Sequence, residues 1–272
     1  MHVTVFILDY QRFPNIAYSI LPHLLNEPLV NQIIISHGSY FYENSNHPLF
    51  PRLSPNEIHE FDISGTQILR VQDNLNPTYQ CFRRWIWIEK LYEKGYLKNS
   101  FVLTHDDDFC FKEGGIQQIL ELRKKGICIC GSGGRFYHPY TLQSANGACP
   151  IAVGQSMLIS IQNVLTVCKQ VRTLGIRSII LYEDDIVVSL LLGKGKNLHY
   201  GIEIEKTILP SPKARWQRFN HLTLRNKTAE IVLRYLKEAS SEPNSLQHLH
   251  SLSTISCTQG TSLPIQPLPL SQ

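Results

Sequence analysis

Three consecutive carboxylates lie just after a short apolar segment: Asp106, Asp107 and Asp108 follow Phe101–Thr104 and His105. Like charges this close repel one another. A chain therefore keeps them at the end of a buried strand when a positive group, usually a divalent cation, neutralises them. Strand alternation points Asp106 and Asp108 the same way and Asp107 the other way. This Asp-x-Asp spacing is typical of sites that hold Mn²⁺ or Mg²⁺ against a diphosphate. The alternative is an acidic helix start, which the helix dipole favours.

A second acidic cluster, Glu183-Asp184-Asp185, follows the apolar run Ile179–Leu181, which we expect to be a strand. One carboxylate here could act as a general base toward a hydroxyl group. It could instead stabilise positive charge that develops on a sugar. The alternative is an N-cap and acidic first turn of a helix over Ile186–Leu192.

The elements that must position these clusters follow from hydrophobic periodicity. A strand at Val3–Leu8, a helix through Ile16–Leu25 and a strand at Asn31–Ser36 predict an opening βαβ unit. The segment His37–Asp62 lacks a sustained period, so we expect a long loop there. Further strands are predicted at Ile68–Val71, Ser100–Thr104, Ile127–Cys130 and Met157–Ser160, and helices at Thr78–Tyr96, Ile116–Lys125, Val164–Leu174 and Thr228–Glu238. The predicted fold is α/β, a mixed and mainly parallel sheet flanked by helices.

Composition sets the outer limits. The chain has 272 residues, of which 43% are hydrophobic, so it can bury a large core. Its 26 basic and 22 acidic residues give a charge of +4, too small an excess to predict a nucleic-acid partner. We expect one domain over residues 1–238 and a disordered Ser/Pro/Leu-rich tail over residues 239–272. The composition does not predict an oligomeric state.

Two features bear on location. No run of eighteen apolar residues occurs, so neither an integral membrane segment nor a signal peptide is expected. The seven cysteines form an odd total and contain no Cys-x-x-Cys pair. Both features favour a cytoplasmic protein, or a luminal one if an anchor precedes this sequence.

Five short motifs, together with the strand Ile33-Ile34-Ile35, occur in the order found in the exostosin-type glycosyltransferase domain, glycosyltransferase family 64. They are Phe6–Arg12, Asp73–Asn76, Phe101–Asp108, Glu183–Ile186 and Arg215–Asn220. The sequence resembles this family from about Val3 to Lys237, and the family 2 glycosyltransferases are the next nearest resemblance. The resemblance implies a GT-A fold and a metal-dependent transfer of a hexosyl or N-acetylhexosaminyl group. It implies a nucleotide sugar donor, a UDP-sugar, with Mn²⁺ or Mg²⁺, and a glycan or other hydroxyl acceptor.

Residue by residue, the resemblance assigns the donor side first. Arg12 matches an arginine that helps hold the nucleotide; the alternative is a solvated loop arginine. Asn74 and Asn76 match asparagines near the nucleotide, although asparagines before Pro77 are also turn formers. In the acidic triplet, Asp106 and Asp107 match residues that lie at the nucleotide sugar. Asp108 matches the residue that binds the metal directly, and Asp106 is assigned as a second metal ligand.

On the catalytic side, Asp185 matches the catalytic aspartate of the family, and Asp184 stands beside it. Arg215 matches an arginine beside the diphosphate and the sugar, where a guanidinium makes strong charge-assisted contacts. The family resemblance implies retention of configuration. Direct deprotonation of the acceptor by Asp184 or Asp185, as in family 2, would give inversion.

The sequence also departs from the family. Ser36-His37-Gly38 replaces asparagines after the second strand, so that base contact is not carried over. Two family cysteines fall on Glu183 and Arg218, which suggests a Glu183–Arg218 ion pair in place of a disulfide. We expect Gly131-Ser-Gly-Gly134 to form a loop after a strand, without the Lys-Ser/Thr of a P-loop.

Two other classes of protein use the same carboxylates. One is a metal-dependent nucleotidyltransferase or hydrolase. The other is a non-catalytic module that binds a sugar nucleotide. No sequence feature separates them from a glycosyltransferase, because all three depend on the same acidic triplet.

Overall fold

The structure is a computed structural model that describes residues 2–10, 12–38, 53–54, 56–73, 75–123, 126–138, 141–176, 180–210 and 221–241. Its N-terminal half alternates strands and helices. The strands are β1 (Val3–Asp9), β2 (Val30–Gly38), β3 (Ile58–Ile63), β4 (Thr66–Asp73), β5 (Phe101–Asp106) and β6 (Phe109–Phe111). The helices are α1 (Phe13–Asn15), the π-helical η1 (Ile16–Ile20), α2 (Leu21–Leu25), α3 (Asn76–Tyr79), the 3₁₀ turn η2 (Gln80–Phe82), α4 (Arg83–Glu93) and α5 (Gly115–Glu121).

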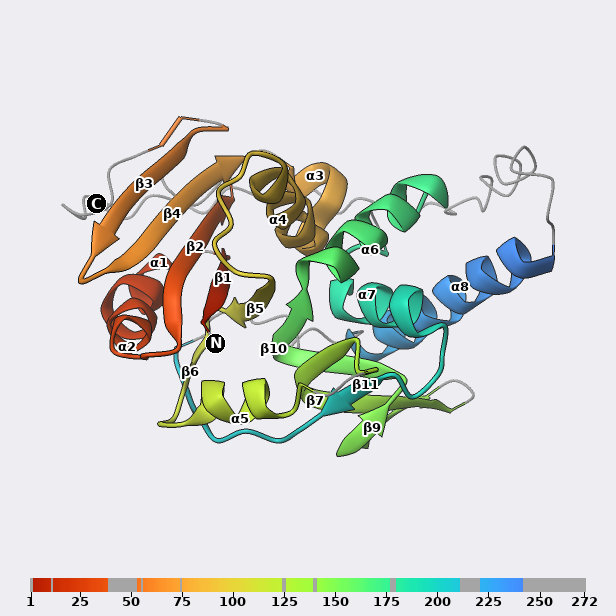
Figure 1. Ribbon diagram of the computed structural model, residues 1–272. Helices are drawn as coiled ribbons and strands as arrows, with labels where there is room; N and C mark the ends of the chain where they lie inside the picture. The colour runs from red at the N-terminus through yellow and green to blue at the C-terminus, as the bar shows by residue number, and fades with distance from the viewer. Residues whose placement is uncertain are drawn as a thin grey trace, which may run out of the picture.

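The described part of the C-terminal half begins with a run of strands, continues through two helices and two short strands, and ends in one helix. The strands are β7 (Ile129–His138), β8 (Thr141–Ala145), β9 (Gly147–Cys149), β10 (Ile151–Ser160), β11 (His199–Gly201) and β12 (Lys206–Ile208). The helices are α6 (Ile161–Thr173), α7 (Asp184–Gly193) and α8 (His221–Ser241). Figure 1 shows α8 lying along α7 and projecting past the body of the molecule.

One large sheet organises these elements. Its order is β3-β4-β2-β1-β5-β10-β7-β11-β9, with β8 paired to β7, and β12 pairs separately with β6. The neighbours β4, β2, β1 and β5 are parallel, whereas β3 and β10 run antiparallel beside them. The chain is therefore α/β, with a large, mixed and mainly parallel sheet flanked by helices, as the sequence predicts (Figure 1).

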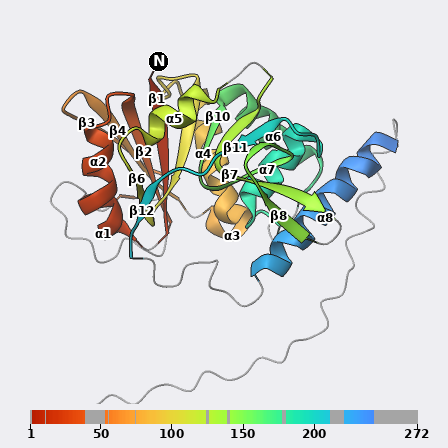
Figure 2. The same ribbon diagram turned by 90° about the horizontal axis from the view of Figure 1, so that it is seen from below.

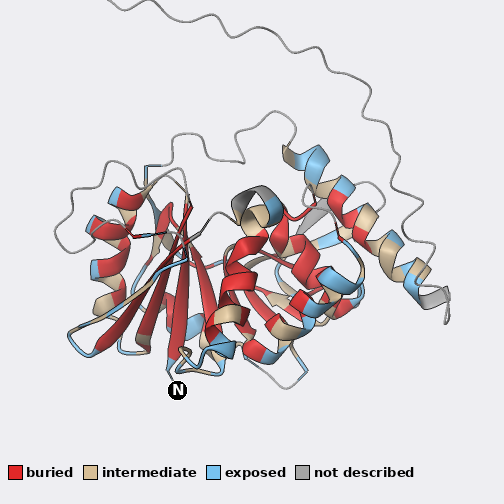
Figure 3. Cartoon of the chain, turned by 90° about the horizontal axis from the view of Figure 1, so that it is seen from above, coloured by how far each residue is buried: buried red, intermediate tan, exposed pale blue. Residues whose placement is uncertain are grey.

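Helices cover both faces of the parallel strands. Along β1, Val5 and Ile7 pack in a core with α1, α2 and α5, while Phe6 packs in the opposite core with α4, α6 and α7. Continuous apolar runs such as Ile33-Ile34-Ile35 suit strands buried on both faces. The parallel strands are accordingly buried along most of their length, between two layers of helices (Figures 2 and 3).

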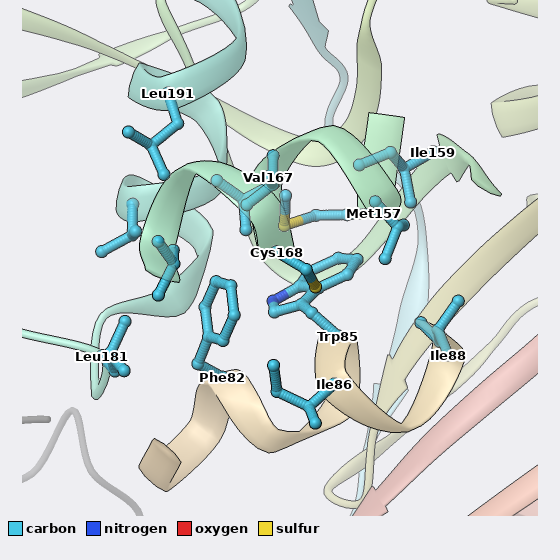
Figure 4. Close-up of a cluster of buried hydrophobic side chains, with 14 of the residues drawn as sticks. Phe82, Trp85, Ile86, Ile88, Met157, Ile159, Val167, Cys168, Leu181 and Leu191 are labelled. Atoms are coloured by element: carbon cyan, nitrogen blue, oxygen red, sulfur yellow. The ribbon is translucent and has the colours of Figure 1, made fainter. Parts of the chain in front are cut away.

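Helix α4 is the central buried helix. It packs against α6 and shares one apolar core with sheet strands, α6 and α7, so Trp85 and Trp87 are both almost fully buried. Both indole rings can be buried because a helix packed on several sides buries more than one stripe. Figure 4 shows Trp85 among apolar side chains of α4, α6 and β10, including Met157 and Cys168.

Four expectations about elements need correction. The segment expected to be a loop over His37–Asp62 contains β3, which pairs antiparallel with β4. The expected strand at Ile179–Leu181 is a turn at its described residues, Ile180 and Leu181, where buried side chains rather than strand pairing account for the apolar run. Helix α8 starts seven residues before the predicted Thr228. It also continues to Ser241, past residue 238, and residues 242–272 of the expected tail lie outside the described part.

The fourth correction concerns the glycine run, which lies inside β7 rather than in a loop. A Cβ atom on Gly201 would lie 2.3 Å from the backbone nitrogen of Gly134 and 2.5 Å from its Cα atom. A Cβ atom on Gly134 would lie 2.8 Å from the Sγ atom of Cys149. These glycines therefore allow strands to approach closely, and no phosphate-binding loop forms here.

No helix in the described ranges is long and apolar enough to cross a membrane.

The close approach predicts different effects for two alanine substitutions. Gly201→Ala should lower the free energy of unfolding by about 3 kcal/mol or more, because the new methyl group meets backbone that cannot move aside. Gly133→Ala is the control, since its Cβ atom would meet Val153 at ordinary distances of 3.6–3.7 Å. Urea denaturation followed by circular dichroism measures both, and equal stabilities would contradict the close approach.

Candidate functional site

The topology creates a switch point between β1 and β5. From β1 the chain passes to β2 on one side, and it later returns as β5 on the other side of β1. Open α/β sheets bind ligands at the carboxyl ends of strands at such a point. Leu8 of β1 pairs with Asp106 of β5, so the loop after β1 and the acidic triplet leave the sheet side by side.

A cleft of about 460 Å³ opens at this switch point. Both acidic clusters line it, although they are far apart in the sequence. Six carboxylates and four arginines contribute to its described lining: Asp106, Asp107, Asp108, Glu183, Asp184, Asp185, Arg12, Arg84, Arg135 and Arg225. The arginines leave an excess of two negative charges among these ten residues.

Contacts of His105 hold the turn that follows β5. The His105 ring donates from Nδ1 to the carbonyl oxygen of Asp106 at 2.6 Å and stacks on Phe109 with ring centroids 4.1 Å apart. Asp106 is the last residue of β5, and Asp107 and Asp108 form the turn. Strand alternation therefore ends at Asp106, and each carboxylate of the triplet has its own set of partners.

Asp107 holds the loop that follows β1. Its carboxylate accepts from the backbone N–H of Tyr10 at 2.5 Å and forms an ion pair with Arg12. The amide of Asn15 donates to the Asp107 carbonyl oxygen at 2.9 Å. The Arg12 side chain is only 10% exposed, so the alternative of a solvated loop arginine is wrong.

Asp106 and Asp108 face the cleft with different neighbours. Two nitrogens of Arg84 bond the same oxygen of Asp106, Oδ1, at 3.1 and 3.2 Å, and one third of the Asp106 side chain is exposed. Asp108 accepts from the amide of Gln155 at 2.7 Å. Gln155 lies where the register of β10 against β7 shifts, and such a bulge re-aims side chains next to a site.

The second acidic cluster begins helix α7. Asp184 and Asp185 form its acidic first turn, where the helix dipole favours carboxylates, and Glu183 is the preceding residue. Asp184 accepts from the indole N–H of Trp85 at 2.8 Å and pairs with Arg84 Nε at 3.0 Å. The helix-start interpretation of this cluster is thus correct, and the same residues also line the cleft.

Arg225 of α8 neutralises the other two carboxylates. Its guanidinium bonds Glu183 at 2.9 Å and Asp185 at 2.8 Å. Burial alone would raise the pKa of Asp185, but Arg225 and the backbone N–H of Ile186 hold that pKa below its ordinary value. Asp185 is therefore an anion at neutral pH and a weak base.

In the acidic triplet Asp106-Asp107-Asp108, burial outweighs the arginines and raises the pKa of two carboxylates. It raises the pKa of Asp106 to about 6, against the opposing charge of Arg84, and the nearby Asp108 and Asp184 add to the rise. It raises the pKa of Asp107 to about 7, against the opposing charge of Arg12. The arginines thus compensate these two carboxylates only in part.

The donor set fits a divalent cation shared with a ligand. Mg²⁺ is usually held by one or two carboxylates together with substrate phosphates, and Mn²⁺ suits the same oxygen ligands. Asp106 and Asp108 supply such carboxylates at the cleft, which carries excess negative charge. Within the described ranges, no group of three or more His, Cys, Asp or Glu side chains forms a complete metal site, so further ligands would have to come from the substrate or from water.

Several residues assigned from the resemblance lie outside the described part: Asn74, the side chain of Asn76, Arg215 and Arg218. The hypothesis of a Glu183–Arg218 pair therefore stays a prediction. What the structure does show is that Glu183 pairs with Arg225.

His37, where the sequence departs from the family, is a buried structural residue. Its ring bonds the Asp9 carboxylate at 2.8 Å and receives a bond from Arg70 at 3.3 Å. Burial lowers the pKa of His37. Its side chain is fully buried and does not line the cleft.

Among the lining residues that sequence reasoning missed are Arg84, Arg135, Gln155, His221 and Arg225. A signal existed for one of them, because the pair Arg83-Arg84 interrupts an otherwise apolar, core-facing helix. Arg135 lies in β7, where burial, and then the charge of Arg225, lower its pKa. The other residues have ordinary local sequences, and only the tertiary structure brings them to the cleft.

Neither the protein-family models nor the curated proteins provide a match for this chain.

The Arg225 pairs predict a pH-dependent loss of stability in Arg225→Gln. Because the folded pKa of Asp185 is depressed, its contribution is present above the ordinary value near 4 and disappears as the pH falls through the folded pKa. Arg225→Gln should therefore destabilise by about 3 kcal/mol at pH 7, since it leaves buried carboxylates unpaired, and by less near pH 3.

Arg234→Gln is the matched control on the same helix. Its pair with Glu230 is half exposed on both sides, so its loss should cost at most about 0.5 kcal/mol at either pH. Urea denaturation at the two pH values gives both numbers. A loss for Arg225→Gln that does not change with pH would show that packing, not charge, is what the substitution removes.

Proposed function

We propose that this chain is a metal-dependent glycosyltransferase with a GT-A fold. In this proposal it moves a hexosyl or N-acetylhexosaminyl group from a UDP-sugar to a hydroxyl group of a glycan acceptor. The observation that carries the proposal is the convergence of both acidic clusters in one cleft at the β1/β5 switch point. The parallel strands β4, β2, β1 and β5, continued by antiparallel β10, support the fold assignment.

The size and charge of the cleft support a nucleotide sugar as the ligand. A volume of about 460 Å³ lies within the range of small-molecule sites. The formal excess of two carboxylates over arginines in the cleft disfavours a diphosphate that enters without a cation. In the proposal Asp108 and Asp106 hold Mn²⁺ or Mg²⁺, and the bound cation supplies positive charge against the diphosphate leaving group.

The chain's own residues take separate roles. Arg12, fixed by Asp107, places a guanidinium beside the nucleotide, where charge-assisted bonds to phosphate are strong. Asp185 stays ionised, so it suits the stabilisation of positive charge on the sugar better than the removal of a proton from the acceptor. This division favours retention of configuration, in agreement with the family 64 resemblance.

A thermal-shift screen of UDP-sugars with and without Mn²⁺ tests the proposal. Specific binding at 100 times Kd adds about 2.7 kcal/mol of stability, so a matching donor should raise the melting temperature by several degrees only when Mn²⁺ is present. Asp108→Asn should remove this shift, because it removes a charged ligand of the cation.

Asp62→Asn is the control for that variant. Asp62 is exposed on the edge strand β3, far along the sheet from the cleft, and its loss should leave the shift intact. An Asp108→Asn protein that still responds to Mn²⁺ and the donor would remove the ligand assignment. A wild-type protein that responds to no UDP-sugar would contradict the function itself.

A second substitution separates binding from transfer. Asp185→Asn keeps the shape of the side chain but removes its charge. The donor shift should therefore change little, while the release of UDP from the bound donor should fall by about 10²-fold. Coupled detection of UDP measures the rate.

Glu183→Gln is the matched control, because it breaks the other ion pair of Arg225. It should slow UDP release far less than Asp185→Asn does. Equal losses in the two variants would assign the effect to Arg225 and not to the charge of Asp185.

A further inference from the structure

Arg84 contacts both acidic clusters at once, through hydrogen bonds to Asp106 and an ion pair with Asp184. Its Nη1 and Nη2 atoms lie 3.1 and 3.2 Å from Oδ1 of Asp106, at the end of β5. Its Nε atom lies 3.0 Å from Oδ2 of Asp184, in the first turn of α7. The side chain is only 9% exposed, so these bonds form in a largely desolvated place.

The position of Arg84 is fixed from behind by the core. The next residue, Trp85, is buried among α4, α6 and β10 and donates its indole N–H to the same oxygen of Asp184, Oδ2, at 2.8 Å (Figure 4). Trp85 therefore orients the Asp184 carboxylate by a hydrogen bond, and the adjacent Arg84 places a positive charge beside the same oxygen. Because a close-packed core tolerates little displacement, the burial of Trp85 also restricts the position of the Asp184 carboxylate at the cleft.

The geometry allows Asp106 to pair with Arg84 and to contact a cation in the cleft at the same time. Both Arg84 nitrogens bond Oδ1, and the carboxylate is one third exposed toward the cleft. A planar guanidinium holds a carboxylate in a defined plane, which the point charge of an ammonium group does not. Arg84 thus engages one oxygen of Asp106 and leaves the other to face a cation in the cleft.

We propose that Arg84 is a positioning residue that couples the metal-side carboxylate Asp106 to the carboxylate Asp184 at the start of α7. This inference rests on the proposed function, because it concerns the geometry of the proposed metal site. The coupling means that a change at Asp184 alters the environment of a cation at Asp106, although Asp184 is not assigned as a ligand.

The neighbouring Arg83 provides a control with the same chemistry and a different place. Arg83 is also buried, but it donates to Ser36 Oγ at 3.0 Å and to the Asp9 carbonyl oxygen at 3.1 Å. These contacts join β1 to β2 and do not involve either acidic cluster. If substituting either arginine merely destabilises the protein, both variants will show it. An effect on the cleft should appear only when Arg84 is substituted.

The experiment uses Mn²⁺ with UDP as the probe and electron paramagnetic resonance of the bound metal as the readout. Wild type, Arg84→Lys, Arg83→Lys and Asp184→Asn are compared, with melting temperatures recorded for each. The rate of UDP release is also measured for each variant, with the UDP-sugar that raises the melting temperature in the thermal-shift screen.

We expect Arg84→Lys to bind Mn²⁺ with nearly unchanged affinity but with an altered spectrum of the bound ion. Its UDP release at saturating donor should fall by about tenfold or more, with KM little changed, because misplacement affects orientation more than binding. Asp184→Asn should alter the spectrum as well. Arg83→Lys should lower the melting temperature and leave the spectrum unchanged.

Two results overturn the proposal in different ways. If wild type binds no Mn²⁺ in the presence of UDP, the proposed function fails and the role of Arg84 falls with it. If wild type binds Mn²⁺ but Asp184→Asn leaves the spectrum unchanged, the coupling alone is wrong. The Asp184→Asn measurement decides the question even if Arg84→Lys fails to fold.

Discussion

The arrangement of this cleft depends on one electrostatic constraint: six carboxylates must share a partly desolvated space at the carboxyl edge of a sheet. Charges removed from water interact strongly, so every carboxylate there needs a cationic or hydrogen-bonding partner. Arg12, Arg84 and Arg225 meet that need from three different elements, the loop after β1, helix α4 and helix α8. Each of these elements is thereby fixed relative to the end of β5 or the start of α7.

The fold meets the constraint by making buried apolar elements carry the charged groups. Helix α4 packs against α6 in the core on one face of the sheet, and it presents Arg84 from a segment in which Trp85, Ile86 and Ile88 fill that core. The apolar turn Ile180-Leu181 likewise places Glu183 at the cleft by burying its own side chains. Hydrophobic burial is non-directional, so the precision of the site comes from close packing and from the hydrogen bonds that packing aligns.

The sequence predicted the elements that have a clear period or an apolar run, and it predicted both acidic clusters. Strands β1, β2, β4 and β5 are such cases, because burial on both faces leaves a continuous apolar signal. It missed β3, whose residues are only half-buried, and it misplaced the glycine run, because a glycine that permits close approach looks the same in sequence as one that forms a loop. Arg225 and Gln155 could not be found, since nothing local distinguishes a helix arginine or a bulged glutamine that a distant carboxylate happens to meet.

The negative charges of the two acidic clusters are compensated to different degrees. The two sides of the cleft therefore differ electrostatically. Arg225 and the backbone N–H of Ile186 outweigh the effect of burial on Asp185, whose pKa is depressed. Burial and neighbouring carboxylates leave Asp106 and Asp107 with raised pKa values despite their arginines. A cation entering the cleft therefore gains most at the end of β5 and least at α7. In the proposed function, the cluster at the start of α7 would be the fixed anion and the cluster at the end of β5 the metal side, so two chemically similar clusters would serve opposite ends of one substrate.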